Sequence, residues 1–250
     1  MNIFKRILGH VYYFYGMIVF IITLILIALV PSWIVLQIPE PKRARIIRPI
    51  YNFWMHLVLW LVFCPVRRVG KDYFKKGQTY VVLFNHNSFV DIMVSTPWTP
   101  GANKTLAKDD LAKIPIFGVI YRTGSILVTR DSEASRKQSF VEMQNTLKMG
   151  LNLILYPEGT RNKTNNPLGE FKDGAFINAI RSQKPIVPGV LFNTKKILPP
   201  RPKFWAWPAK IEVHFLPPIE TKGMSLREIE QLKNRIYQQM HDYIVQHQKS

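Results

Sequence analysis

Two apolar stretches separated by a short basic connector dominate the first part of the chain. Residues 9–39 contain no Lys, Arg, Asp or Glu, and residues 11–30 alone supply the roughly 20 apolar positions that a membrane-spanning helix needs. A second stretch, residues 50–66, follows a connector with four basic residues, Lys42, Arg43, Arg45 and Arg48. The pattern predicts an N-terminal membrane-anchoring helical hairpin over residues 1–66.

The charges around these stretches favour one membrane arrangement over two others. Two full spans would export the basic connector against the positive-inside rule, and one span would place Lys5 and Arg6 outside. A hairpin dipping into one leaflet keeps all of these residues at one anionic surface. We therefore favour a monotopic hairpin that is retained in the protein, since no small-residue cleavage site follows the apolar segment. A core helix of the globular part is an equally good interpretation of residues 50–66.

Beyond Pro65 the pattern changes to short β-branched runs that alternate with helical stretches. Five runs read as strands: residues 80–84, 125–128, 151–156, 186–191 and 211–215. Helices are expected over residues 133–149 and 225–248, the second opening with a capping box of Ser225 and Glu228. Residues 198–208 read as a proline-broken loop. Residues 67–250 are thus predicted to form an α/β domain with a mixed, mostly parallel sheet flanked by helices.

The chain is strongly basic, with 34 Lys and Arg against 16 Asp and Glu and a net charge of +18. Such a surface attracts anionic lipid, phosphorylated substrates or nucleic acid. Zinc-finger spacing, RNA-binding signatures and a helix-turn-helix pattern are missing from the sequence, so no nucleic acid is expected as a partner. The single cysteine, Cys64, lies in an apolar stretch and permits no intrachain disulfide.

Candidate chemistry begins where the strand over residues 80–84 ends. His86 follows this strand directly and precedes a predicted helix, the position at which α/β proteins place active sites. Asp91 can turn back towards His86 if the helix starts after His86, with Ser88 as its N-cap. Such a pair forms a general base near neutral pH, although the same residues also fit a plain capping arrangement.

Four segments in order resemble the motifs of the glycerolipid acyltransferase family. Within that family, the resemblance is greatest to bacterial 1-acylglycerol-3-phosphate acyltransferases. The segments are Asn85-His86 with Asp91, residues 124–130, residues 156–161 (YPEGTR) and Val187-Pro188-Gly189. The resemblance covers residues 80–191. It departs from the family at Thr129, where an acidic residue is frequent, and at Tyr156, where phenylalanine is commoner.

The resemblance implies a role for each matching residue. His86 would remove the proton from the acceptor hydroxyl, and Asp91 would hold the imidazole. Arg130, Arg161 and Lys108 would bind the acceptor phosphate. Glu158, Gly159 and Thr160 complete the matching block, and backbone N–H groups around Gly159 are candidate oxyanion donors. The Val187-Pro188-Gly189 segment would lie near the acyl donor, although sheet packing explains it equally well.

The expected reaction is transfer of a fatty acyl group from acyl-carrier protein or coenzyme A to the sn-2 hydroxyl of 1-acylglycerol 3-phosphate (lysophosphatidic acid), giving phosphatidic acid. No nucleophile elbow suggests a covalent intermediate, and neither a metal nor another cofactor is expected beyond the acyl-CoA or acyl-ACP co-substrate. The expected partners are membrane lipids, lysophosphatidic acid and the acyl donor. We expect the catalytic domain on the cytoplasmic side of the bacterial inner membrane. Glycerol 3-phosphate or another lyso-lipid as acceptor, or a non-enzymatic basic membrane-surface or nucleic-acid-binding protein, are the alternatives.

Overall fold

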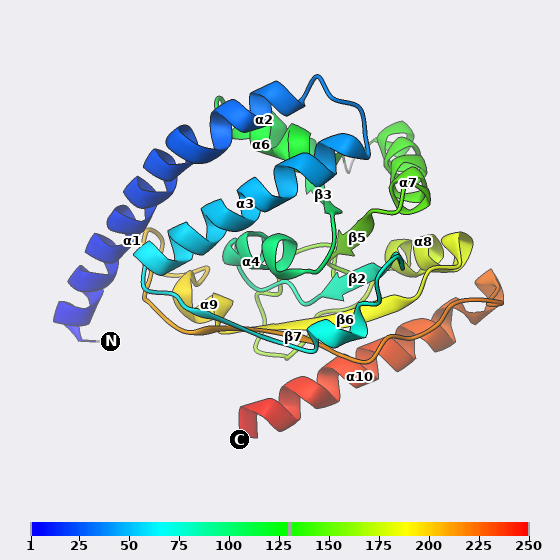
Figure 1. Cartoon of the computed structure of the whole chain (residues 1–250). Helices are drawn as coiled ribbons and strands as arrows, with labels where there is room; N and C mark the ends of the chain where they lie inside the picture. Colours follow the sequence, from blue (N-terminus) through cyan, green and yellow to red (C-terminus); the bar gives the residue numbers. More distant parts are fainter. Residues whose placement is uncertain (1, 130–131, 250) are drawn as a thin grey trace.

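A seven-stranded mixed sheet with helices on both faces forms the centre of the protein (Figure 1). The computed structural model describes residues 2–129 and 132–249, and the side chains of the last two of these are excepted. The strands are β1 (Val66–Val69), β2 (Val81–Phe84), β3 (Asn103–Lys108), β4 (Ser125–Val128), β5 (Asn152–Leu155), β6 (Ile186–Phe192) and β7 (Ile211–Phe215). The helices of the α/β part are α4 (Val90–Trp98), α5 (Asp109–Ala112), α6 (Phe117–Gly124), α7 (Glu133–Lys148), α8 (Gly174–Ser182), α9 (Thr194–Ile197) and α10 (Ile229–Lys249), with short 3-10 turns η2 (Lys71–Tyr73) and η3 (Leu226–Glu228).

The strand order is β1-β7-β6-β2-β5-β3-β4, and every neighbouring pair is parallel except β6 and β7. The predicted mixed, mostly parallel α/β sheet is confirmed, and so are its five predicted strands. The sequence did not predict β1 and β3. In β1, VRRV, two arginines separate the two valines, and β3, NKTLAK, has a single β-branched residue, so neither stands out as a strand.

Alternating side chains of the sheet enter two separate cores. On β2, Val82 and Phe84 face the side covered by the N-terminal helices and α4, whereas Val81 and Leu83 face the side covered by α7, α8 and α10. All four residues of β2 are fully buried, as expected for the central strand of a sheet with helices on both faces. The carboxyl ends of β2, β5, β3 and β4 meet at one edge because these strands are parallel.

The first apolar stretch forms one long helical rod made of α1 (Ile3–Thr23), a π-helical segment η1 (Leu24–Leu29) and α2 (Val30–Val35). By length and composition alone, Ile3–Val35 could cross a membrane, although core helices and signal sequences can share these properties. It is the one such helix among the residues that the structure describes. Exposed apolar residues recur every three to four positions along it: Phe4, Ile7, Val11, Phe14, Ile18, Ile22 and Leu26.

The second helix, α3 (Lys42–Leu61), begins earlier than predicted and contains the basic connector. The expectation of a separate polar link is therefore wrong. The Arg43 guanidinium lies 2.8 Å from the Glu40 carboxylate, and Arg48 donates to the Thr99 carbonyl at 2.9 Å. These two cations are thus already engaged within the protein. The helix ends at Leu61, five residues before the apolar stretch ends at Val66.

The second apolar stretch was interpreted as part of a membrane anchor or as a core helix, and the two faces of α3 fit one interpretation each. Trp54 and Val58 are buried in the same core cluster as Val82 and Phe84, whereas Phe53 and Trp60 are 61% and 72% exposed. The rod packs against α3, and α3 packs against α4 (Figure 1). A separate anchor ending at residue 66 therefore stays a prediction, because the core runs on beneath α3.

The predicted loop over residues 198–208 has neither helix nor strand and docks on α1. The Ala206 N–H donates to the Gly9 carbonyl at 3.1 Å, and the His10 ring lies 2.7 Å from the Phe204 carbonyl. A β-carbon on Gly9 would collide with the Trp205 indole, so a glycine is needed where this loop meets the helix. The predicted capping box of Ser225 and Glu228 is present and opens the turn before α10.

Candidate active site

The His86 imidazole stands at the carboxyl end of β2 and bonds to a buried carboxylate. Its Nδ1 lies 2.8 Å from Oδ2 of Asp91, whose side chain is fully buried, whereas the His86 side chain is 16% exposed. Among the residues that the structure describes, none bonds to the second ring nitrogen, Nε2. A carboxylate on Nδ1 fixes the tautomer that leaves Nε2 able to accept a proton.

Asp91 is held in place by the backbone that leads into α4. Its Oδ2 also accepts the N–H groups of Asn87 and Ser88, at 2.6 and 2.7 Å. The helix begins at Val90, after His86, as the predicted pair requires. Phe89 occupies the N-cap position of α4, one residue after the predicted cap, but the Ser88 side chain still makes the expected bond: its Oγ accepts the N–H of Val90 at 3.3 Å. The capping and pairing interpretations are therefore compatible.

Tyr156 packs against the other side of the imidazole. Its ring stacks on His86 with centroids 4.2 Å apart and an angle of 21° between the planes. Burial raises the pKa of the Tyr156 phenol well above its usual range, so the hydroxyl is neutral and hydrogen-bonds to Oγ of Ser95 on α4 at 2.7 Å. In the sequence this tyrosine stands out only as a departure from the commoner phenylalanine of the family. In the structure it positions His86 in two ways. Its ring stacks on the imidazole, as a phenylalanine ring also could, and the bond between its hydroxyl and Ser95 fixes the ring in place.

Glu158 joins the loop after β5 to the His86 loop. Its two carboxylate oxygens accept the N–H groups of His86 and Gly169, each at 2.8 Å. Burial raises the pKa of the Glu158 carboxyl, whereas these two backbone bonds act in the opposite direction. A second bond joins the same two loops: the Asn162 N–H donates to the His86 carbonyl at 2.6 Å. Glu158 therefore positions His86 and contributes no oxyanion donor of its own.

The N–H of Gly159 is already used within the loop. It donates to the Tyr156 carbonyl at 3.0 Å, and the residue has a φ of +68°, which favours glycine. The geometry thus gives no support to Gly159 as an oxyanion donor. Within the described part of the chain, the N–H groups of Thr160 and Arg161 have no acceptor, and these donors remain available to a substrate.

Arg161 reaches across to the loop that carries the histidine. Its guanidinium carbon lies 3.7 Å from the centre of the Phe89 ring, three residues after His86. No carboxylate of the described residues pairs with Arg161, so its donors stay available for an anion. A cation stacked on an exposed aromatic ring beside the imidazole suits a phosphate-bearing substrate.

Lys108 belongs to the neighbouring strand pair, β3 and β4. Lys108 is exposed at the end of β3, in register with Val128 at the end of β4, which places it on the same sheet edge as His86. No hydrogen bond or ion pair of the described residues joins it to His86 or Arg161. Arg130 lies outside the described residues, so its predicted phosphate contact is a prediction only.

The segment Val187-Pro188-Gly189 lies inside β6, next to β2. A β-carbon on Gly189 would collide with the Phe84 ring, so close sheet packing accounts for the glycine. The neighbouring Asn85 side chain, missed as a site residue, ties β2 to β6 by bonding to both backbone groups of Leu191, at 2.7 and 3.0 Å. These contacts fix the strand ends from which His86 projects.

An apolar cavity of about 760 Å³ opens beside the histidine loop. Phe89 and Val90 line one part of it, and side chains from the rod, α3 and α6 line much of the rest, among them Phe20, Trp54 and Ile120. This volume lies within the roughly 300–1,000 Å³ typical of ligand pockets. The lining and size suit a hydrocarbon chain.

Comparisons with known proteins agree with this site. A model of the family described as acyltransferase matches residues 65–191. The chain is 30% identical over 200 residues to the 1-acyl-sn-glycerol-3-phosphate acyltransferase of Cocos nucifera, covering 77% of this chain and 62% of that protein. It is 34% identical over 130 residues to the enzyme of the same name from Helicobacter pylori, covering 52% of this chain and 54% of that protein.

The match to the coconut protein thus spans less than two thirds of the relative's length. The fold is similar to the crystal structure of the 1-acyl-sn-glycerophosphate (LPA) acyltransferase PlsC from Thermotoga maritima, with a TM-score of 0.76 at 20% identity, covering 100% of this chain and 99% of that one. The family match covers just over half of the chain and includes His86, Asp91 and the segment from Tyr156 to Arg161. The chain belongs to the acyltransferase family.

Proposed function

We propose that this protein transfers a fatty acyl group from an acyl thioester to the sn-2 hydroxyl of 1-acylglycerol 3-phosphate, giving phosphatidic acid. The observation that carries the proposal is the pair of His86 and Asp91, joined at 2.8 Å, at a sheet edge next to an apolar cavity. Nε2 of His86 removes the hydroxyl proton as the oxygen attacks the thioester carbonyl. The imidazolium that forms is stabilised by the Asp91 carboxylate. The proton then leaves with the thiol, so no covalent acyl-enzyme is needed.

Cationic groups at the same edge support a phosphorylated acceptor. Arg161 stacks on Phe89 beside the histidine, and Lys108 extends from the end of β3. Arg130 is proposed as a third phosphate ligand from its place in the sequence. Two relatives named above are 1-acyl-sn-glycerol-3-phosphate acyltransferases, which supports this acceptor over a neutral one.

The cavity supports an acyl chain as part of the substrate. Each methylene that leaves water for an apolar site gains about 0.8 kcal/mol, so a long chain binds strongly in a pocket lined by Phe20, Trp54 and their neighbours. The net charge of +18 attracts an acidic acyl-carrier protein and coenzyme A alike. The donor is therefore an acyl thioester of either carrier.

The N-terminal helices place the site at a membrane in this proposal. The exposed apolar side chains along the rod and on α3 enter one leaflet from the cytoplasmic side of the inner membrane, and Lys5, Arg6, Lys42 and Arg45 face its anionic headgroups. A lysophospholipid then reaches His86 from the same leaflet with its chain still in hydrocarbon.

Two alternatives make different predictions. An enzyme that acylates glycerol 3-phosphate or another lyso-lipid would use the same His86 but prefer a different acceptor. A non-enzymatic basic membrane protein would need neither the pair nor the cavity. The hydrogen-bonded carboxylate on His86 and the unpaired Arg161 favour the enzyme.

An acyl-transfer assay with an acceptor panel tests the proposal. Purified protein in detergent is supplied with acyl-CoA or acyl-carrier protein and with lysophosphatidic acid, glycerol 3-phosphate or a lyso-aminolipid, and the products are identified by mass spectrometry. We expect phosphatidic acid from lysophosphatidic acid with at least one donor. Preferential acylation of another acceptor would contradict the substrate assignment, and no transfer to any acceptor would contradict the activity.

A further inference from the structure

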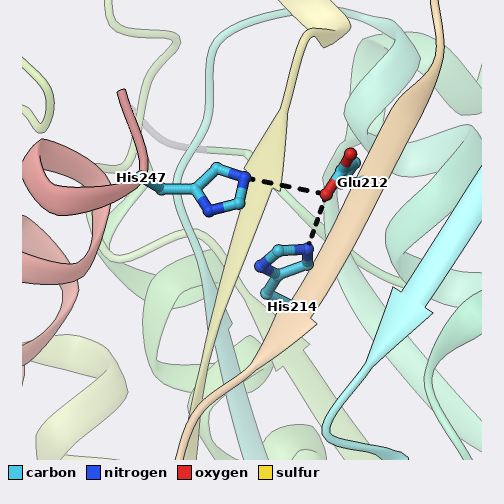
Figure 2. Close-up of side chains that lie close together, drawn as sticks. All are labelled: Glu212, His214 and His247. Atoms are coloured by element: carbon cyan, nitrogen blue, oxygen red, sulfur yellow. Dashed lines mark hydrogen bonds and ion pairs between the residues drawn. The ribbon is translucent and has the colours of Figure 1, made fainter. Parts of the chain in front are cut away.

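Three side chains with metal-ligating atoms converge on the side of the sheet covered by α10 (Figure 2). Glu212 and His214 come from β7, and His247 comes from the last turn of α10. These elements are separate from β2, α4 and the loop after β5, which build the His86 site. The sequence shows no metal motif here because His247 is more than 30 positions further along the chain than Glu212 and His214.

The spacing of the three ligand atoms is close to that of a metal site. Oε2 of Glu212 lies 2.9 Å from Nε2 of His214 and 3.7 Å from Nε2 of His247. All three atoms lie within 4.8 Å of one another. Ligands of tetrahedral zinc, with bonds of about 2.0–2.2 Å, are separated by about 3.3–3.6 Å. Small side-chain rotations would therefore bring all three atoms into bonding distance of one ion.

The surroundings hold the first histidine as metal sites usually do. His214 is 3% exposed, and its other ring nitrogen, Nδ1, lies 2.8 Å from the Tyr243 hydroxyl. Metal-bound histidines almost always donate this second N–H to a neighbouring acceptor, and a tyrosine hydroxyl can either accept or donate. The Phe192 ring packs against both imidazoles, with centroids 5.2 and 4.4 Å away. The side chain of His247 is 38% exposed, which leaves a route for an ion to enter.

The two oxygens of Glu212 have different neighbours. Lys210 lies 3.1 Å from Oε1, whereas Oε2 faces both histidines and is the oxygen placed to bind an ion with them.

We propose that Glu212, His214 and His247 bind one divalent transition-metal ion of the zinc type. Two imidazoles and one carboxylate match the preferences of zinc, whereas calcium and magnesium require more oxygen ligands. The bound ion joins the end of α10 to β7, which pairs on both sides within the sheet. It therefore fixes the C-terminal helix against the domain.

Zinc binding by the tag-free full-length protein tests this site directly. Protein stripped with EDTA is titrated with zinc chloride by calorimetry, and the bound metal is counted by mass spectrometry after dialysis. We expect one zinc per chain in the wild type and loss of that zinc in His247→Ala and in Glu212→Gln. His241→Ala is the matched control, because this histidine lies on the same helix but outside the cluster, so the variant should keep the zinc.

Two further readouts separate a built site from loose binding. Cobalt(II) in the same site should show the intense visible bands of tetrahedral coordination, and His247→Ala should lose them. Tyr243→Phe, which keeps the ring and removes the hydroxyl, should weaken zinc binding by roughly 10- to 100-fold. Absence of zinc binding by the wild type, or retention of one zinc by both His247→Ala and Glu212→Gln, would overturn the site. So would equal loss in His241→Ala.

Discussion

Replacement of Asp91 by asparagine isolates the charge behind His86 while preserving the shape of the site. The Asn oxygen can take the place of Oδ2 and keep the bonds from the N–H groups of Asn87 and Ser88. The new amide nitrogen then takes the place of Oδ1, which is buried and has no hydrogen-bond partner among the described residues. Leaving that nitrogen unpaired should lower the free energy of unfolding by about 1–3 kcal/mol.

The effect on catalysis should be larger than the effect on stability. With Nδ1 and Oδ2 at 2.8 Å, the charges of an imidazolium and a carboxylate are centred about 4 Å apart. At that separation they attract by about 4 kcal/mol at an effective dielectric constant of about 20. Asparagine loses this attraction when His86 takes up a proton, which corresponds to a rate about 10³-fold lower.

Turnover at saturating donor and acceptor measures this loss. We expect a fall in kcat with little change in the KM for lysophosphatidic acid, because Asp91 lies behind the imidazole and bonds to none of the proposed phosphate ligands that the structure describes. Asp72→Asn, an exposed aspartate on η2, is the matched control and should behave like the wild type. An Asp91→Asn enzyme that is folded and within tenfold of wild-type turnover would refute the reasoning.

Three other substitutions test the phosphate contact, the docked loop and the membrane arrangement. Arg161→Ala should raise the KM for lysophosphatidic acid by roughly 10- to 150-fold through loss of charge-assisted bonds, and an equal rise for the acyl donor would place this arginine elsewhere. Gly9→Ala should lower the unfolding temperature, because its methyl group would collide with the loop indole, whereas Gly16→Ala has room and should not; equal effects would contradict the docking. An exposed cysteine made by Lys42→Cys with Cys64→Ser should react with an impermeant reagent in inside-out vesicles, and labelling only in intact cells would refute the one-leaflet hairpin.

The pairing of His86 with Asp91 could be predicted from the sequence because both residues occupy one short segment. His86 and Asp91 lie five positions apart in the chain, and the turn into α4 alone brings them together. The central strands could also be predicted, since strands such as β2, buried on both faces, are continuous apolar runs. The sequence pattern was sufficient to predict features that depend on residues close together in the chain.

Features that depend on distant parts of the chain could not be predicted in this way. Glu158 accepts from His86 and Gly169 only after two loops meet, so its positioning role has no local signal. The start of α3 at Lys42 was missed because four basic residues resemble a linker until Arg48 is seen to bond to Thr99. The cavity and the cluster of Glu212, His214 and His247 likewise arise from packing between separate elements.

The central claim is that His86 is the general base of acyl transfer to lysophosphatidic acid, and turnover of His86→Ala tests it most directly. A general base contributes roughly 10²- to 10⁴-fold, so the purified variant should lose at least about 10²-fold in the rate of phosphatidic acid formation. The variant should stay folded and bind vesicles like the wild type, because the buried Asp91 carboxylate keeps its bonds from the N–H groups of Asn87 and Ser88 when the ring is removed. Near-normal turnover in a folded His86→Ala protein would contradict the account.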